Sequence, residues 1–298
     1  MLAYWVRSCG ISFAQRNPVY SSIESYVSNA EIVFTGTISE IGGPEVKAGY
    51  KGFFITVQPS ETLKGAKADS FKLFVYNENR EDALPQWKKS KDVDRLWFLG
   101  KADEKDEGLR NWNSITLNPD ESGTPLRMTG YFAMDWSLLR TPKEILSVTR
   151  RACKEVPSGS KMHSLYYMPE TIRKQFPFNT GGELLVPLCP ALEKVALKMI
   201  KNPSSFIPPY KSLFNISQED YDKHKPNDEN SIRRMGVQIL GEFKSDQNIT
   251  LLKTLLDDPF VEDLSYERKT YSIRKFSYEA LTKWGVDVKR PELTPVKP

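Results

Sequence analysis

The chain has 298 residues, a length that suits about two domains of ordinary size. Hydrophobic residues make up 39% of it and charged residues 27%, which is typical of a folded globular protein and argues against disorder. The net charge of +4 comes from 42 basic and 38 acidic residues that are interspersed, so we predict that the chain does not bind nucleic acid. No apolar run approaches the roughly 18 residues of a transmembrane helix, and we predict no membrane span.

The first residues do not have the pattern of a working signal peptide. Residues 2–6 are apolar, but this run is shorter than the roughly 7 to 15 residues of a signal-peptide core. The positive charge of Arg7 also follows the run instead of preceding it. If the natural start lies upstream, the same residues are the remnant of a signal peptide.

The three cysteines, Cys9, Cys153 and Cys189, are far apart and form no CxxC pair. Their spacing therefore predicts neither a zinc site nor a redox motif, and no metal or cofactor site is predicted. Because their number is odd, at least one thiol is free. We expect these residues to be small buried hydrophobic side chains.

The first half of the chain has the pattern of a β-rich domain. After a short helix predicted over 19–27, short strands are predicted at 32–41, 53–57, 71–76, 96–99, 112–117 and 127–134. The strand at 71–76 has apolar side chains on both faces. No helix-length segment separates the strands, which favours a small barrel or sandwich over an α/β sheet.

Glycine and proline predict where these strands bend and end. The first is expected to bulge at Gly36 and to stop at residues 42–44, and the second to stop near Pro59. Residues 77–95 are predicted to form a charged loop.

Short motifs in this half resemble a known family. They are the alanine–acid pair Ala30 and Glu31, the sequence VFTG at 33–36, LKG at 63–65 and LWFL at 96–99. Together they resemble the netrin-like OB barrel, which is found in tissue inhibitors of metalloproteinases and in many bacterial extracytoplasmic proteins. The resemblance covers about residues 19–117. It implies a five-stranded barrel that serves as a binding scaffold outside the cytoplasm.

The N-terminus departs from the pattern of the inhibitors. Those proteins place the terminal amine and carbonyl of a Cys-x-Cys sequence on the protease zinc, whereas here Ile11 stands where a second cysteine would follow Cys9. We therefore do not expect inhibition of metalloproteases by that mechanism. Binding of oligonucleotides or sugars, the other common use of such barrels, has no residue-level support in this sequence.

Helices and irregular segments alternate in the middle of the chain. Thr141 followed by Pro142 predicts the start of a helix that continues to Ala152. A second helix is predicted over 192–200. Residues 154–182 and 202–230 lose periodicity and contain several prolines, so they are predicted to be long loops or insertions.

The C-terminal part contains the same apolar pattern twice. Ile273 lies 41 positions after Ile232, and the same interval relates Met235 to Phe276, Ile239 to Ala280, Leu240 to Leu281 and Phe243 to Trp284. A period of about 40 to 47 residues is typical of HEAT and armadillo repeats. Each copy predicts an amphipathic helix buried against a neighbour, and a middle helix over 249–256 is predicted to end at 257–259. The region 141–291 thus resembles a short, irregular HEAT-like array.

A search for catalytic patterns finds no HExxH, GxSxG, Walker or GxGxxG sequence. The two histidines, His163 and His224, fall in segments predicted to be irregular, and we expect both at the surface. A Cys–His nucleophile would need Cys153 or Cys189 beside one of them. The helices of the stack also carry Arg233, Arg234 and Arg274. Two interpretations of these arginines stay open: they bind an anion, or they form the solvated side of the helices.

The sequence thus predicts an α+β chain of two domains: an OB-like β-barrel over 19–135 and a HEAT-like helical domain over 141–291, with insertions at 154–182 and 202–230. Two functions of different class are compatible with it. The favoured one is a non-catalytic interaction or scaffold protein, which binds another protein through the barrel and the helical surface. The alternative is a ligand-binding protein or an enzyme whose site lies in the irregular segments at the junction of the two domains.

Overall fold

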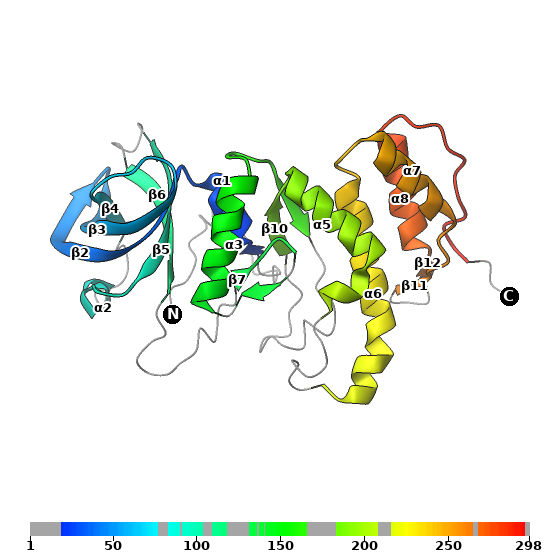
Figure 1. The fold of residues 1–298 in the computed structure, drawn as a ribbon, viewed down its shortest axis with the longest axis horizontal. Helices are drawn as coiled ribbons and strands as arrows, with labels where there is room; N and C mark the ends of the chain where they lie inside the picture. Colours follow the sequence, from blue (N-terminus) through cyan, green and yellow to red (C-terminus); the bar gives the residue numbers. More distant parts are fainter. Residues whose placement is uncertain are drawn as a thin grey trace.

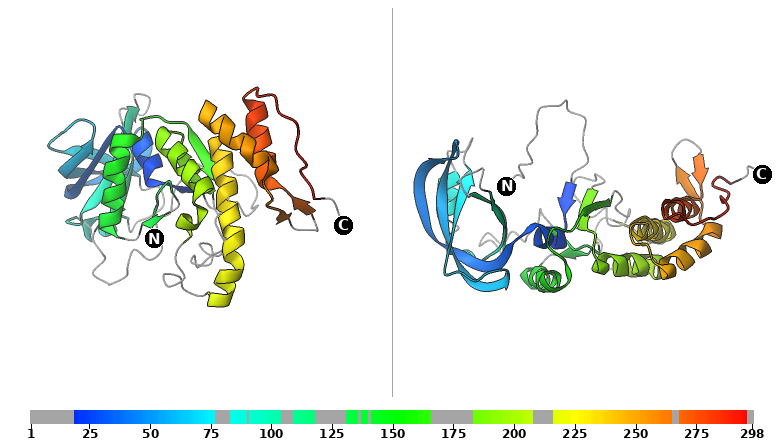
Figure 2. Two further views of the ribbon diagram at one scale, coloured as in Figure 1. Left: turned by 45° about the vertical axis from the view of Figure 1, so that its right-hand side comes forward. Right: turned by 90° about the horizontal axis from the view of Figure 1, so that it is seen from above.

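A five-stranded antiparallel sheet lies at one end of the molecule and a stack of helices at the other, with a small second sheet between them (Figure 1). The structure is a computed structural model, and it describes residues 19–76, 83–89, 91–103, 109–117, 131–135, 137–139, 141–165, 183–207, 216–264 and 268–295. Seven helices and these sheets make the described part a mixed α+β fold, as predicted. Seen from above, the elements follow one another in a row (Figure 2).

The strands of the large sheet are hydrogen-bonded in the order β4-β3-β2-β5-β6. Their bounds are β2 Ile32–Lys47, β3 Tyr50–Lys64, β4 Phe71–Tyr76, β5 Arg95–Asp103 and β6 Leu109–Thr116. Within the described residues no ladder joins β4 to β6, so the hydrogen-bonded sheet is open. One face of it has a core of its own, which includes Phe34, Ile38, Phe53, Ile55, Leu73 and Trp97.

The first two strands are longer than predicted. The predicted turn at 42–44 is wrong, because β2 continues through these residues with a shift of register against β3. The hairpin turns instead at Ala48 and Gly49, whose φ angles are 49° and 80°. β3 likewise passes Pro59, since this proline lies opposite the irregularity at Gly36, where the predicted bulge is confirmed.

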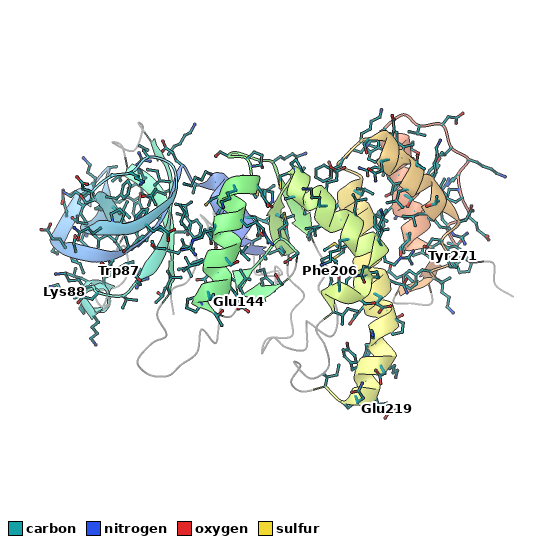
Figure 3. All side chains as sticks on the ribbon, viewed as in Figure 1. Trp87, Lys88, Glu144, Phe206, Glu219 and Tyr271 are labelled. Atoms are coloured by element: carbon teal, nitrogen blue, oxygen red, sulfur yellow. The ribbon has the colours of Figure 1, made fainter. Side chains whose placement is uncertain are left out.

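The predicted charged loop at 77–95 contains a helix. This helix, α2, covers Ala83–Lys89, and its Trp87 is buried against the core of the large sheet, with Leu84 beside it (Figure 3). Leu84 and Trp87 lie three positions apart and therefore on one side of the helix. Burial of this side explains why a segment rich in charge is helical here.

The described end of the predicted sixth strand, residues 131–134, does not pair with the large sheet. Its end, β7 (Tyr131–Phe132), pairs with β8 (Leu138–Leu139) and not with the large sheet. Phe132 also forms a parallel bridge with Ser22. Residues 118–130 lie outside the described ranges.

A second sheet brings the beginning of the chain to its middle. β1 (Val19–Ser21) pairs in parallel with β10 (Glu183–Pro187), which pairs with β9 (Met162–Leu165). The predicted helix at 19–27 is therefore wrong at its start. The helix α1 covers Ile23–Asn29, because the Ser22 side chain caps it by accepting the N–H of Ser25.

The long loop predicted at 154–182 is wrong in part, since only residues 156–161 of its described stretches lie outside helices and strands. The helix α3 (Pro142–Glu155) runs into it, and β9 occupies a further part. Residues 166–182 lie outside the described ranges. The predicted start of α3 is confirmed, since Thr141 and Glu144 form a capping box with Pro142 at the first helical position.

The irregular segment predicted at 202–230 is also wrong in part. After the confirmed helix α5 (Pro190–Lys201), a 3₁₀ turn η2 covers Pro203–Phe206, and α6 spans Gln218–Leu240. The Ser217 side chain caps α6 by accepting the N–H of Asp220, and Pro226 is accommodated within the helix. Figure 3 shows Glu219, in the first turn of α6, beyond the other helices.

The last helices lie where the sequence predicts helices. The middle helix, α7 (Asp246–Thr254), passes into η4 (Leu255–Asp257) and ends at Asp258, as predicted. A hairpin of β11 (Glu262–Leu264) and β12 (Arg268–Thr270) leads to α8 (Ser272–Lys283). No helix in the described ranges is long and apolar enough to cross a membrane.

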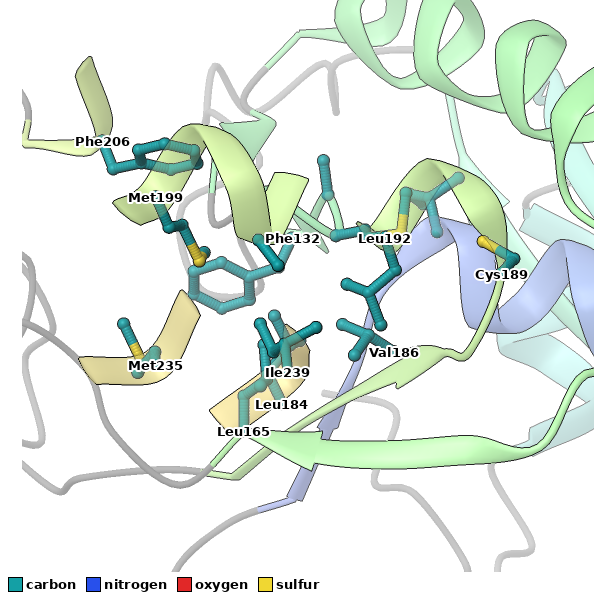
Figure 4. Close-up of a cluster of buried hydrophobic side chains, with 14 of the residues drawn as sticks. Phe132, Leu165, Leu184, Val186, Cys189, Leu192, Met199, Phe206, Met235 and Ile239 are labelled. Atoms are coloured by element: carbon teal, nitrogen blue, oxygen red, sulfur yellow. The ribbon is translucent and has the colours of Figure 1, made fainter. Parts of the chain in front are cut away.

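One cluster of buried side chains runs from the outer face of the large sheet to α8. It begins with Val33 and Phe98 of that face, continues through α1, α3 and α5, and ends with Ile273 and Leu281. Figure 4 shows its middle, where Phe132 lies between the second sheet and α5. Side chains from 23–30 and 132–134 belong to this cluster, so both ends of the range predicted for the barrel pack with the helices.

Candidate functional site

The outward face of β3 and β4 carries a row of aromatic rings. Phe54 and Phe74 are cross-strand partners with ring centroids 5.0 Å apart. Tyr76 lies 5.3 Å from Phe74 and 5.0 Å from Tyr50, and all three contacts are edge-to-face. Because side chains alternate along a strand, the residues between them face the core of the sheet instead. We call Tyr50, Phe54, Phe74 and Tyr76 the aromatic row.

Two large apolar side chains are exposed near the β2–β3 hairpin, one on each face of the sheet. Val46 pairs with Lys51 and shares the face of Phe53, whereas Tyr76 belongs to the aromatic row. Among the described residues, Val46 and Tyr76 are the large hydrophobic side chains that stay exposed, at 63% and 45%. Val46 lies in the β2–β3 hairpin, and Tyr76 ends β4 beside Tyr50 of the same hairpin. The Lys72 Nζ lies 4.4 Å from the centroid of the Phe54 ring and adds positive charge. Apolar side chains with a polar rim are typical of an interaction surface.

The residues that resemble the netrin-like motifs meet at a joint between α1 and the large sheet. The Lys64 Nζ donates to the carbonyl oxygens of Val27 and Ala30, at 2.6 and 2.7 Å, and so satisfies the end of α1. Burial lowers the pKa of this amine. Gly65 has a φ of 85°, and a Cβ there would lie 2.5 Å from the Glu31 carbonyl oxygen. In this structure the motif residues therefore join a helix to a sheet.

Two ion pairs lie at the surface of this joint. Arg110 of β6 donates to Glu31 at 2.6 Å and to the Gly100 carbonyl oxygen at 2.9 Å. Arg150 of α3 pairs with Glu61 of β3 at 2.7 Å. Exposed pairs of this kind contribute roughly 0 to 1 kcal/mol each, so we regard them as orienting contacts.

A buried carboxyl group lies at the other end of α1. Glu24 is 1% exposed, and its Oε2 accepts the Met134 N–H at 2.8 Å. Its Oε1 is buried without a hydrogen-bond partner, and the Arg151 Nη2 lies 3.6 Å away. Burial, assisted by the neighbouring Asp135 carboxylate, raises the pKa of Glu24 to about 7. Reasoning from the sequence missed this group, because an acidic residue in the first turn of a helix is ordinary.

Two of the three cysteines that were predicted to be buried, Cys153 and Cys189, belong to the described residues. Cys9 lies outside them. Cys153 belongs to α3, and Cys189 precedes α5 as its N-cap residue. Burial raises the pKa of both thiols, which lowers the thiolate fraction and the reactivity at neutral pH. Within the described ranges no group of three His, Cys, Asp or Glu side chains could hold a metal ion.

The histidines do not lie in loops. His163 is a partly buried residue of β9, opposite Val186 of β10, and burial lowers its pKa. His224 belongs to α6. The prediction of two surface loop histidines is therefore wrong in its secondary structure.

The arginines of the stack have partners within the chain itself, two of them carboxylates. Arg233 pairs with the Asp258 carboxylate, and Arg234 with Glu262 at 2.5 Å. The Arg274 Nε donates to the Asp258 carbonyl oxygen at 2.6 Å, and its guanidinium lies 3.7 Å from the centroid of the Tyr271 ring. These contacts favour a structural role over either an anion site or a merely solvated face.

Comparison with known protein families, with characterised proteins and with solved structures gives no match. The function is therefore argued from the residues of this chain alone.

Proposed function

We propose that this protein is a non-catalytic interaction protein, which binds a protein partner through the outer face of an OB-like barrel and the surface of a HEAT-like stack. The observation that carries the proposal is the exposure of two large apolar side chains at the hairpin end of the sheet: Tyr76 at the end of the aromatic row, and Val46 on the other face. Leaving large apolar side chains in water forgoes about 1.5 to 3 kcal/mol each, which burial in an interface would recover. Tyrosine is also enriched among the residues that dominate binding energy.

Several features support an OB-like barrel. The first three strands form a meander, the fourth crosses over to pair with the first, and α2 lies in this crossover between β4 and β5. The edge strands β6 and β4 approach one another, since the Trp112 Nε1 donates to the Phe74 carbonyl oxygen at 2.9 Å. Trp112 also contacts Trp87 and Trp97, with ring centroids 5.8 and 5.5 Å apart. A side chain thus bridges the two edges that a barrel would close.

The contacts between α6 and α8 support a HEAT-like stack. Leu240 and Leu281, at equivalent positions of the repeat, are both fully buried. The ends of the two helices are tied together as well, because Lys283 pairs with Glu242 at 2.8 Å. Burial of equivalent sites between neighbouring helices is what a stacked repeat requires.

The proposal is tested with the double variant Val46→Ser and Tyr76→Ser of the intact chain. The intact chain serves as bait in a pull-down from its native source, and the captured protein is then purified and titrated against each variant. We expect the double variant to lose more than tenfold in affinity, because truncating each of two apolar anchors typically costs about 1 kcal/mol or more. Gln58→Ser, a change at an exposed position of β3, is the matched control and should bind as the natural chain does.

Equal binding by both variants would show that the aromatic row is not the site. A small molecule that stays with the chain through purification, seen by native mass spectrometry, would instead favour the ligand-binding alternative. Far-ultraviolet circular dichroism of each variant separates a lost contact from a lost fold.

A further inference from the structure

Glu24 connects segments that are 110 residues apart in the sequence, because its Oε2 accepts the Met134 N–H. The same end of α1 is fixed to the second sheet, where the Ser22 N–H donates to the Leu185 carbonyl oxygen at 3.1 Å. Ser22 also bridges to Phe132 of β7. The N-terminal helix, the second sheet and the β7–β8 segment therefore meet at this one carboxyl group.

The surroundings of Glu24 suit a neutral carboxyl group better than an ionised one. The charged or titratable groups near it are Arg151 from α3, Asp135 from the turn after β7 and Cys189 before α5. Arg151 is half-exposed and beyond hydrogen-bond distance, and Asp135 has the same sign of charge as an ionised Glu24. An ionised Glu24 thus accepts hydrogen bonds only from backbone N–H groups, its own and that of Met134, while its Oε1 stays buried without a hydrogen-bond partner. A buried charge that is paired so incompletely is unstable relative to an exposed one.

We propose that Glu24 is a proton-controlled latch, which holds the β7–β8 segment on α1 while its carboxyl group is neutral and loosens the segment when the group is ionised. Ionisation favours states in which the carboxylate reaches water, and reaching water breaks the bond to Met134. The pKa of about 7 in the closed state places this change near neutral pH. In an open state the carboxyl group has its ordinary pKa of 4.5, so the closed state holds the proton more tightly. The opening equilibrium therefore rises as the pH increases from about 4.5 to about 7 and is constant above that.

Hydrogen exchange of the intact chain tests the latch. We expect the opening equilibrium of the Met134 amide and of the segment 131–139 to rise about tenfold between pH 6 and pH 8, after correction for the intrinsic exchange rate. Amides of α6 and α8 should not share this change. A flat response at Met134 would overturn the proposal, and so would an equal response throughout the chain, because that is the behaviour of global unfolding.

Three variants assign the response to Glu24. Glu24→Gln keeps an oxygen acceptor for Met134 and should abolish the pH dependence. Asp135→Asn removes a like charge and should move the midpoint to lower pH, whereas Arg151→Met removes a cation and should move it to higher pH. The double variant His163→Gln and His224→Gln is the control for histidine titration and should behave as the natural chain.

An unchanged pH dependence in Glu24→Gln would refute the latch. If Glu24→Gln does not fold, the opposite midpoint shifts of Asp135→Asn and Arg151→Met decide, and equal midpoints in both would refute the proposal as well.

Discussion

At some positions of the large sheet the chain packs so closely that a Cβ has no room, whereas between α6 and α8 large side chains fill equivalent positions of the 41-residue pattern. The contact of α5 with α6 shares the close approach, since a Cβ at Gly236 would lie 2.8 Å from the Ala196 carbonyl oxygen. A Cβ at Gly36 would lie 2.2 Å from the Gln58 carbonyl oxygen, and one at Gly52 would lie 2.6 Å from the Phe74 ring. In the stack, Leu240 and Leu281 are fully buried at equivalent positions of the repeat. The sheet at Gly36 should therefore be sensitive to added atoms, and the contact between α6 and α8 to removed ones.

The largest effect is expected from emptying the equivalent sites of the stack. Leu240→Ala and Leu281→Ala should each lower the free energy of unfolding by about 2 to 5 kcal/mol, because each removes a buried side chain and leaves a cavity. The measurement is chemical denaturation of the intact chain. Leu251→Ala, at a partly buried leucine of α7, is the matched control and should cost less.

Denaturation midpoints that stay unchanged in both Leu240→Ala and Leu281→Ala would make the 41-residue alignment a coincidence. The HEAT-like interpretation of the stack would then lose its energetic basis, and the contrast with the sheet would disappear.

Glu24 lies between the two regions and shows whether they are stabilised together. Its pKa is raised from 4.5 to about 7, so the folded chain binds this proton more tightly than the unfolded chain. The contribution of Glu24 to stability is therefore fully present below pH 4.5 and is lost as the pH rises to about 7. We expect the stability of the natural chain relative to Glu24→Gln to fall by about 3 kcal/mol over this window. Urea denaturation at closely spaced pH values measures it, and parallel curves for the two chains would contradict the expectation.

The sheet is tested by adding one methyl group. Gly36→Ala should lower the free energy of unfolding by about 1 to 3 kcal/mol, since the new Cβ meets backbone atoms that have to shift. Gly43→Ala is the matched control, because a Cβ there meets nothing within 4 Å. It should leave stability unchanged or raise it slightly through the unfolded state. Equal effects of the two changes on the thermal midpoint would show that the close approach at Gly36 is not limiting.

The same contrast explains what the sequence could predict. The helices at 192–200 and 249–256 and the two that carry the 41-residue pattern were predicted, because apolar side chains of a fixed period mark them, whereas the first part of α6 was not. Helix-start signals such as Thr141 with Pro142 are local. The ends of β2 and β3 were not predicted correctly, because a β-bulge is a backbone irregularity that depends on the partner strand. The pairing of β1 with β10 joins residues about 160 positions apart, and no local pattern encodes it.

The candidate site left only a faint signal in the sequence. The strand at 71–76 has apolar residues on both faces, and Phe74 and Tyr76 of the aromatic row are the apolar residues of its outward face. That Phe74 is buried while Tyr76 stays exposed depends on the elements around them. Glu24 gave no signal, since its burial arises from Met134 and α3, which are distant in sequence.

The smallest effect concerns the arginines that occupy equivalent positions of the repeat and both bind Asp258. Arg233→Met should cost about 1 to 2 kcal/mol, because its charged hydrogen bond is partly buried and hydrogen bonds to charged groups are worth about 1.5 to 3 kcal/mol. Lys253→Met, at an exposed position of α7, should stay within about 0.5 kcal/mol. Because Arg233 and Arg274 share one partner, the double change to Met should cost a different amount from the sum of the single changes. If Arg233→Met behaves like Lys253→Met in chemical denaturation, the two repeats are joined by apolar packing alone.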